Sequence, residues 1–334
     1  MRQRILLAGP SMGRLAEKIV AARPGEIRLG KLQWKTFPNG EPNVKILEDP
    51  DDIRASSVSY LMGFKNQLDY KPQMRVLNAL RRLGPGRMQL LVPFHSEATS
   101  ERRDEEGDVP CAVGFADDLA SNSGAACRVF FYDIHALPVL EMFPKTMTII
   151  PRTGTTLLKD WIRENGLHEQ VVIGFPDRGA RKSFTRRFNG NAKDGIKFHM
   201  VACDKVRIGT EGEDRLVTLC PGEEADVRGK FVILVDDILR TAKTMLAAVE
   251  AMFRAGAAKV GIYSTHPDFE PGAVERIMAA KDLVEFVMIT DSCPEAAYAV
   301  DGMGPFKVVS LAEKLAADVC EDLTITERGL MDGE

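Results

Sequence analysis

The chain has 334 residues, of which 45% are hydrophobic and 28% charged, and its formal net charge is −4. These values are typical of a soluble globular protein, and the length indicates two domains. The net charge gives no reason to expect nucleic acid or an anionic membrane surface as a partner. No stretch is apolar for long enough to cross a bilayer. The six cysteines show neither a CxxC pair nor zinc-ligand spacing, so we expect reduced thiols in a cytoplasmic protein.

Strand-like apolar runs alternate with helical patterns along the chain, which predicts parallel sheets covered by helices. The predicted strands are 5–8, 57–62, 88–93, 129–133, 170–176, 231–235, 260–264 and 286–290, and the clearest predicted helices are 15–20, 74–82 and 245–255.

The two halves share a local echo that indicates a duplicated α/β domain. Residues 82–93 and 254–264 each contain a helix end, a glycine turn, a basic residue and a strand. We place the domain boundary between 150 and 151, so the second domain covers 151–325. Residues 326–334 are polar and predicted to be a flexible tail.

The most informative run is Phe231-Val-Ile-Leu-Val-Asp-Asp-Ile-Leu-Arg-Thr-Ala-Lys-Thr244. An apolar strand ends in Asp236 and Asp237, which can accept hydrogen bonds from a vicinal diol. A turn bearing Thr241 and Thr244 follows, and the helix start after it can offer N–H groups to a phosphate. The simpler interpretation is a helix N-cap with acids favoured by the helix dipole. The complete run favours a sugar-phosphate site.

Two further polar clusters follow predicted strands. His135, in Asp133-Ile-His135, could bind a metal or a phosphate, although a single histidine is more often structural. Asp177 is the second residue of the run Pro176-Asp-Arg-Gly-Ala-Arg-Lys182, where it could hold Mg²⁺. The two arginines and the lysine of this run could face phosphate oxygens. The alternative for that segment is a solvated helix start.

Two weaker clusters complete the set. Lys205 and Arg207 are two residues apart, so on an extended, mobile segment they could close together over a transferring phosphoryl group. Phe37, Asn39 and Glu41 could stack on a base and bond its polar edge, although Asn-Gly is also typical of an ordinary β-turn.

In this order and spacing, the five segments resemble the ribose-phosphate diphosphokinase (phosphoribosyl-diphosphate synthetase) family. The run 231–244 also resembles the loop of type I phosphoribosyltransferases. The resemblance extends from Gly9 to Val308-Val-Ser-Leu-Ala312. It implies an α/β fold of two similar type I phosphoribosyltransferase-like domains, each a mainly parallel sheet flanked by helices. The first domain would carry the ATP-side motifs and the second the sugar-phosphate loop.

The resemblance also implies an activity and its components. The expected reaction transfers a diphosphoryl group from MgATP to the anomeric hydroxyl of ribose 5-phosphate and releases AMP. It implies Mg²⁺ as cofactor, ATP and a ribose phosphate as partners, and a dimer-based homo-oligomer such as a hexamer. The implied residues are Lys205, Arg207 and His135 for catalysis; Phe37, Asn39, Glu41 and Arg102 for ATP; His135 and Asp177 for the metal; and Asp236, Asp237, Arg240, Thr241, Ala242, Lys243 and Thr244 for the sugar phosphate.

The chain departs from the family pattern in two places. Thr99 and Ser100 replace an Arg-Gln pair that serves ATP, and Arg102 is the candidate substitute. In the sugar-phosphate loop, Arg240 replaces an acid and Lys243 a glycine. Because glycine permits positive φ, we expect Lys243 to restrict the turn.

These departures leave several functions open. The acceptor could be ribose 5-phosphate, a related 5-substituted ribose, or an ADP-ribose-like molecule. A non-catalytic regulatory paralogue and a phosphoribosyltransferase are the alternatives outside this reaction. The presence of Lys205, Arg207 and His135 favours an enzyme, and the two-domain length disfavours a phosphoribosyltransferase.

Overall fold

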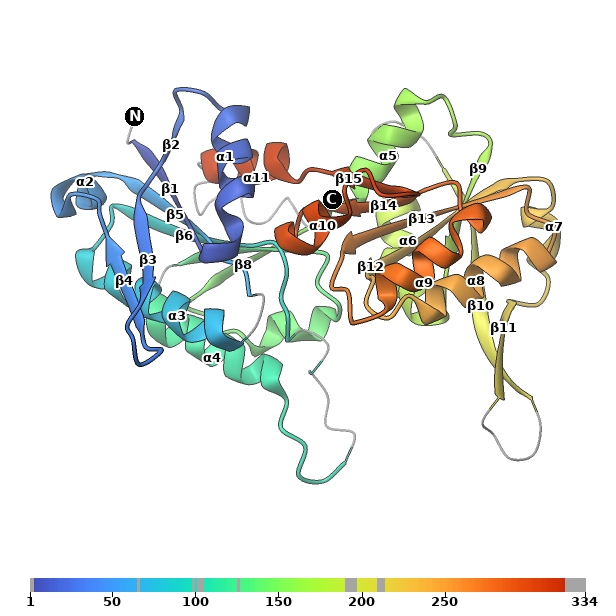
Figure 1. The fold of residues 1–334 in the computed structure, drawn as a ribbon, viewed down its shortest axis with the longest axis horizontal. Coiled ribbons are helices and arrows are strands. Elements are labelled where there is room, and N and C mark those ends of the chain that lie inside the picture. The colour runs from blue at the N-terminus through green and yellow to red at the C-terminus, as the bar shows by residue number, and fades with distance from the viewer. Residues whose placement is uncertain are drawn as a thin grey trace. The chain divides into compact units, whose positions relative to one another are not determined.

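The computed structural model describes residues 3–64, 67–97, 100, 105–124, 127–189, 197–208 and 214–321. The chain divides into two compact units (Figure 1). Unit 1 combines Met1–Thr153 with Ser292–Glu295 and Ser310–Asp322, and unit 2 is built mainly from Gly154–Asp291 and Ala296–Val309. Residues 310–321, which the sequence interpretation assigned to the second domain, therefore belong to unit 1. The predicted tail 326–334 lies outside the described residues.

Unit 1 contains a parallel six-stranded sheet with the order β2-β1-β5-β6-β7-β8, and a separate antiparallel hairpin, β3-β4. Its elements are β1 (Arg4–Ala8), η1 (Pro10–Met12), α1 (Gly13–Ala22), β2 (Ile27–Leu29), β3 (Leu32–Thr36), β4 (Pro42–Ile46), α2 (Pro50–Ala55), β5 (Ser57–Leu61), α3 (Gln67–Leu83), β6 (Arg87–Val92), α4 (Cys111–Ser123), β7 (Arg128–Tyr132), η2 (Leu137–Met142), β8 (Thr148–Arg152) and α11 (Ala312–Cys320).

Unit 2 contains a seven-stranded sheet with the order β11-β10-β9-β12-β13-β14-β15, in which only the β10-β11 pair is antiparallel. Its elements are α5 (Thr155–Glu164), β9 (Val171–Phe175), α6 (Arg178–Asn189), β10 (His199–Ile208), β11 (Asp214–Leu219), α7 (Glu224–Val227), β12 (Phe231–Ile238), α8 (Lys243–Arg254), β13 (Lys259–His266), α9 (Ala273–Ala279), η3 (Lys281–Leu283), β14 (Val287–Thr290), most of α10 (Pro294–Val300) and β15 (Phe306–Val309).

The two sheets share one topology. With the hairpin β3-β4 and the edge strand β11 set aside, both follow the order 2-1-3-4-5-6 when their strands are counted along the chain. The echo noticed in the sequence joins β6 with β13, which are the fourth strands of their sheets. The predicted α/β class, with mainly parallel sheets flanked by helices, is confirmed.

Strand β12 shows why the sequence forms a sheet that is buried on both faces. Val232 and Leu234 pack in one apolar cluster with residues of α8, including Met252. Ile233 and Val235 pack in another cluster with residues of α5 and α6. Because alternate residues of a strand point to opposite faces, a strand between two helical layers must be apolar at every position.

The C-terminal helix α11 is anchored to the unit 1 sheet by polar groups. Asp318 accepts hydrogen bonds from the Tyr132 hydroxyl at 2.6 Å and from Arg152 Nε at 2.8 Å. Glu321 pairs with Arg152 and with Arg128, the latter at 3.2 Å. Asp318 is only 4% exposed, so its charge is matched at a position where an unpaired carboxylate would be costly. No helix in the described part of the chain has the length and apolar character of a membrane span.

Candidate active site

The predicted sugar-phosphate residues lie at the carboxyl edge of the unit 2 sheet. Strands β9 and β12 are neighbours, and the strand order reverses between them. Asp177 follows β9. Asp236 and Asp237 are among the last residues of β12, which extends beyond the predicted end at Val235. In open α/β sheets this position, outside the carboxyl ends of strands at the reversal of order, is the usual ligand site.

The Asp236 carboxylate is affected by its two neighbours, Asp237 and Asp177. The Asp237 N–H donates to Asp236 Oδ1 at 3.0 Å, and the Ile238 N–H donates to Asp237 Oδ1 at 2.9 Å. Burial, followed by the nearby Asp237 and Asp177 carboxylates, raises the pKa of Asp236 well above its ordinary value. Such an edge favours a ligand that donates hydrogen bonds or brings positive charge, as a ribose diol or a hydrated cation does.

Asp177 has the helix-start role that its sequence allowed, and its metal-binding role stays a prediction. Its Oδ1 accepts the Ala180 N–H at 2.9 Å, so it caps α6. Two of the three cations that follow it are paired with acids, and the expectation that the cations face phosphate oxygens stays a prediction. Arg178 pairs with Asp204 at 2.7 Å, and Arg181 pairs with Glu223.

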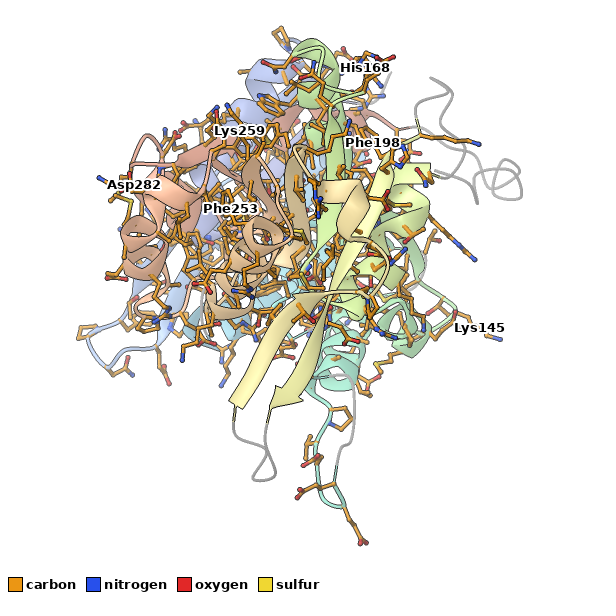
Figure 2. All side chains as sticks on the ribbon, turned by 90° about the vertical axis from the view of Figure 1, so that its right-hand side faces the viewer. Lys145, His168, Phe198, Phe253, Lys259 and Asp282 are labelled. Carbon is orange, nitrogen blue, oxygen red and sulfur yellow. The ribbon has the colours of Figure 1, made fainter. Side chains whose placement is uncertain are left out.

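Strand β10 carries Lys205 and Arg207 past the end of β9. The β9-β10 pairing ends at Phe175 and Ala202, and β10 continues in antiparallel pairing with β11. Figure 2 shows these two strands extending together from unit 2. The backbone of Lys205 and Arg207 is therefore an extension of the sheet edge that also carries the three carboxylates.

The loop between β12 and α8 turns at a different residue from the one expected. Ala242 has φ 62° and is the N-cap of α8, while Lys243 is the first residue of that helix. The Lys243 N–H donates to Thr241 Oγ1 at 3.3 Å. The expectation that Lys243 restricts the turn is wrong, because the left-handed conformation belongs to Ala242.

The expected adenine-contacting residues form the turn of the hairpin β3-β4. The Phe37 N–H donates to the Glu41 carbonyl at 2.7 Å, and the Glu41 N–H donates to Asn39 Oδ1 at 3.1 Å. Gly40 has φ 84°, which the Asn-Gly turn requires. The Phe37 side chain is 48% exposed, which leaves its ring accessible to a partner.

His135 follows β7 in unit 1 after a strained residue. Asp133 is fully buried and has φ 37°, and its Oδ1 accepts the Thr153 hydroxyl at 2.6 Å. Non-glycine residues with positive φ are uncommon and often occur near functional sites. The turn at Asp133 directs the chain out of the sheet, and His135 itself is exposed.

His95 is a notable residue that sequence reasoning missed. It follows β6, is 3% exposed, and stacks on Phe115 with ring centroids 4.2 Å apart. Its Nδ1 accepts the Glu97 N–H at 3.3 Å, while the buried Nε2 has no hydrogen-bond partner among the described residues. Burial lowers the pKa of His95 to about 3. Thr99, which departs from the family pattern, and Arg102, the candidate substitute, lie outside the described residues.

We expect His95→Phe to make stability less sensitive to acid. The native state keeps His95 neutral, whereas the unfolded chain takes up a proton below pH 6.5. The contribution of neutral His95 to the free energy of unfolding is fully present above pH 6.5. It is lost as the pH falls toward 3, by up to about 1.4 kcal/mol for each pH unit. Urea unfolding at pH 7.5 and pH 5 should show a smaller difference for the variant.

The matched control for this prediction is His168→Phe, since His168 lies exposed on unit 2 (Figure 2). It should retain the pH dependence of the wild type. If His95→Phe and the wild type lose the same free energy of unfolding between the two pH values, the buried neutral histidine has no such effect.

The carboxylates fit a magnesium ion that is shared with a substrate. Among the described residues, no three His, Cys, Asp or Glu side chains are arranged to hold a metal ion by themselves. Mg²⁺ commonly uses one or two protein carboxylates and completes its coordination with water and substrate phosphates. Asp177 caps α6 through Oδ1, and its Oδ2 makes no hydrogen bond in the described part of the chain, so this oxygen could be such a ligand.

Comparison with known proteins identifies the family to which the chain belongs. Residues 154–290 match the model of the phosphoribosyl transferase domain. Over 315 residues the chain is 33% identical to ribose-phosphate pyrophosphokinase 3, chloroplastic, of Oryza sativa subsp. japonica, covering 92% of this chain and 73% of the relative. The chain belongs to the ribose-phosphate pyrophosphokinase family. Ribose-phosphate pyrophosphokinase 4 of Arabidopsis thaliana is 32% identical, with 89% of this chain and 86% of the relative covered.

The pyrophosphokinase fold extends over both units. The crystal structure of phosphoribosylpyrophosphate synthetase from Mycobacterium smegmatis matches with a TM-score of 0.78 and 22% identity, covering 96% of this chain and 98% of that one. The predicted family and its two-unit α/β fold are therefore confirmed.

Proposed function

We propose that this pyrophosphokinase family member transfers the diphosphoryl group of ATP to the anomeric hydroxyl of ribose 5-phosphate and releases AMP. One observation carries the proposal. At the edge of the unit 2 sheet, an acid pair, a turn that leads into a helix start, and the extension of β10 occur together. Each supplies a different part of the reaction, and family membership gives the reaction class.

The acceptor half of the site is the segment 236–244. Asp236 and Asp237 accept hydrogen bonds from the ribose hydroxyls, and so hold the sugar by its diol. The N–H groups at the start of α8 face the 5-phosphate, where the helix dipole favours negative charge. These contacts fix the anomeric oxygen for attack, which lowers the entropic part of the barrier.

The transfer step then depends on position and charge. The anomeric oxygen bonds to the β-phosphorus while the bond from that phosphorus to the oxygen of AMP breaks, and the hydroxyl proton leaves to solvent. Lys205 and Arg207 stabilise the charge that builds on the phosphoryl oxygens. Bound Mg²⁺ would neutralise charge on the ATP phosphates, and we assign Asp177 in unit 2 and His135 in unit 1, each considered by itself, as residues that would hold a metal ion.

The nucleotide half of the proposal uses the hairpin turn. Phe37 stacks on adenine, and Asn39 and Glu41 bond its polar edge, which suits an exposed aromatic ring beside an amide and a carboxylate. We further propose a dimer-based homo-oligomer in which this turn serves a neighbouring subunit. The six cysteines are free thiols, as we expect for a cytoplasmic enzyme.

The decisive test is the identity of the released nucleotide. We expect purified protein with MgATP and ribose 5-phosphate to produce AMP in amounts equal to the sugar diphosphate, measured by chromatography and ³¹P spectra. ADP as the only nucleotide product would exclude diphosphoryl transfer. Complete absence of turnover with every phosphorylated pentose would favour a non-catalytic regulatory paralogue.

A further inference from the structure

The acceptor loop is held by the end of β13, by α9 and by the segment between them. The Leu239 N–H donates to the His266 carbonyl at 2.9 Å, and the Glu270 N–H donates to the Arg240 carbonyl at 3.1 Å. Arg276 Nε donates to the Thr241 carbonyl at 2.9 Å. One bond uses a loop N–H and two use loop carbonyls, and together they tie the turn to residues that no sequence motif had indicated.

Arg240 is occupied on that same side. Its Nε and Nη2 atoms lie 3.0 Å and 2.9 Å from Asp268 Oδ2, and both side chains are about one-third exposed. Because two nitrogens of the guanidinium contact one carboxylate oxygen of Asp268, the charge of Arg240 is balanced within the protein. The positive charge that the sequence placed in the loop at Arg240 is therefore directed to the β13-α9 segment.

Lys243 differs from Arg240 in its surroundings. It is exposed at the first position of α8, and within the described residues its ammonium forms no ion pair. A cation at a helix N-terminus is disfavoured by the helix dipole unless an anion binds there. Of the two substituted positions in the loop, only Lys243 keeps a cation available to a ligand.

We propose that Asp268 and Arg276 are positioning residues for the acceptor site. Asp268 draws Arg240 away from the 5-phosphate, Arg276 fixes the turn at Thr241 and Ala242, and Lys243 is the added cation that meets the ligand. This inference rests on the proposed function. It disfavours an acceptor whose 5-substituent contains a diphosphate bridge, because binding the second phosphate would require Arg240 to be released from Asp268.

Gly272 supports the role of Arg276. It has φ 81°, and a Cβ built there would lie 2.8 Å from Arg276 Nη1. A side chain at this position would strain the backbone and displace the guanidinium from Thr241. The turn before α9 is thus shaped to let Arg276 reach the acceptor loop.

The experiment compares two ligands that differ at the 5-position. The KM for ribose 5-phosphate and the inhibition constant of ADP-ribose, measured against ribose 5-phosphate, are determined for Asp268→Asn. We expect the inhibition constant of ADP-ribose to fall about tenfold relative to that KM, because Arg240 becomes available to the second phosphate. The KM for ATP should stay within about twofold. Asp268→Glu should retain the pair and the wild-type ratio.

A double variant tests whether Arg240 is responsible. In Asp268→Asn combined with Arg240→Gln, the gain for ADP-ribose should disappear, which a general loosening of the loop would not produce. Lys243→Gln should raise the KM for ribose 5-phosphate at least about tenfold, whereas Lys259→Gln, which removes a remote exposed lysine, should not. Lys243→Arg should restore most of the affinity.

Failure of the inference can be told apart from failure of the proposed function. Suppose that the wild type releases AMP with ribose 5-phosphate, but Asp268→Asn keeps the wild-type ratio of the ADP-ribose inhibition constant to the KM for ribose 5-phosphate. The positioning role is then refuted and the reaction stands. A gain for ADP-ribose that persists in the double variant refutes the role of Arg240. If Asp268→Asn does not fold, an unchanged KM for ribose 5-phosphate in Lys243→Gln overturns the inference.

Discussion

Lys205→Ala is expected to lower kcat by about 10²-fold or more while changing the KM for either substrate less than about threefold. The reason is that a cation facing the transferring phosphoryl group stabilises charge that exists only in the transition state. Strand β10 supports this role, because it carries Lys205 beyond β9 at the edge where Asp177 follows that strand. The measurement is initial-rate AMP release at saturating MgATP and ribose 5-phosphate.

The control for Lys205→Ala is Lys230→Ala, which removes an exposed lysine of unit 2 before β12. It should retain wild-type kcat. Arg207→Ala should resemble Lys205→Ala, and the double variant should lose less than the product of the two effects if both cations act on one transition state. A kcat within about threefold of wild type for Lys205→Ala would remove this residue from catalysis.

Asp236→Asn is expected to change activity and stability in opposite directions. Loss of a charged hydrogen-bond acceptor for the ribose diol should lower kcat/KM for ribose 5-phosphate by at least about tenfold. In the ligand-free protein, however, the same change removes a carboxylate whose pKa is raised by burial and by the neighbouring Asp237 and Asp177 carboxylates. We therefore expect a higher Tm, by about 2–4 °C for each 1 kcal/mol gained.

The pH dependence of that stability gain follows from the direction of the pKa shift. Below the ordinary aspartate pKa of 3.8, Asp236 is protonated in both folded and unfolded chains and costs nothing. As the pH rises, the unfolded chain ionises first, so the wild type becomes progressively less stable until the raised folded-state pKa is passed. The Tm difference between Asp236→Asn and wild type should thus be larger at pH 7.5 than at pH 5.

Asp282→Asn is the matched control for this charge change, since Asp282 is exposed on unit 2 (Figure 2). It should alter neither activity nor the pH dependence of Tm. A lower Tm for Asp236→Asn at pH 7.5 would show that its carboxylate stabilises the empty site and would contradict this account.

The acid pair and the loop that follows it were predictable because they are contiguous in sequence. A strand, two carboxylates and a helix start within 231–244 determine where a ligand can bind, whatever surrounds them. The same holds for the turn at Asn39 and Gly40, whose geometry depends on two adjacent residues. The central strands were also predictable, since runs such as 231–235 are apolar throughout.

Contacts between distant residues account for what the sequence did not reveal. Asp268 pairs with Arg240 from 28 positions away, and Arg276 reaches Thr241 from 35 positions away. Those contacts accompany a turn in which Ala242, and not Lys243, takes positive φ. His95 was missed for a similar reason, because its stacking partners Phe115 and Phe131 come from α4 and β7.

The anchoring of α11 on unit 1 has a consequence for how the protein is made. Asp318 and Glu321, which complete the polar contacts of β7 and β8, are supplied by a segment that follows the last strand of unit 2. During synthesis, the ribosome must finish the whole of unit 2 before unit 1 receives its final helix. Unit 1 therefore cannot mature first in the usual N-to-C order. A chain cut at the predicted boundary would leave the first fragment without that helix.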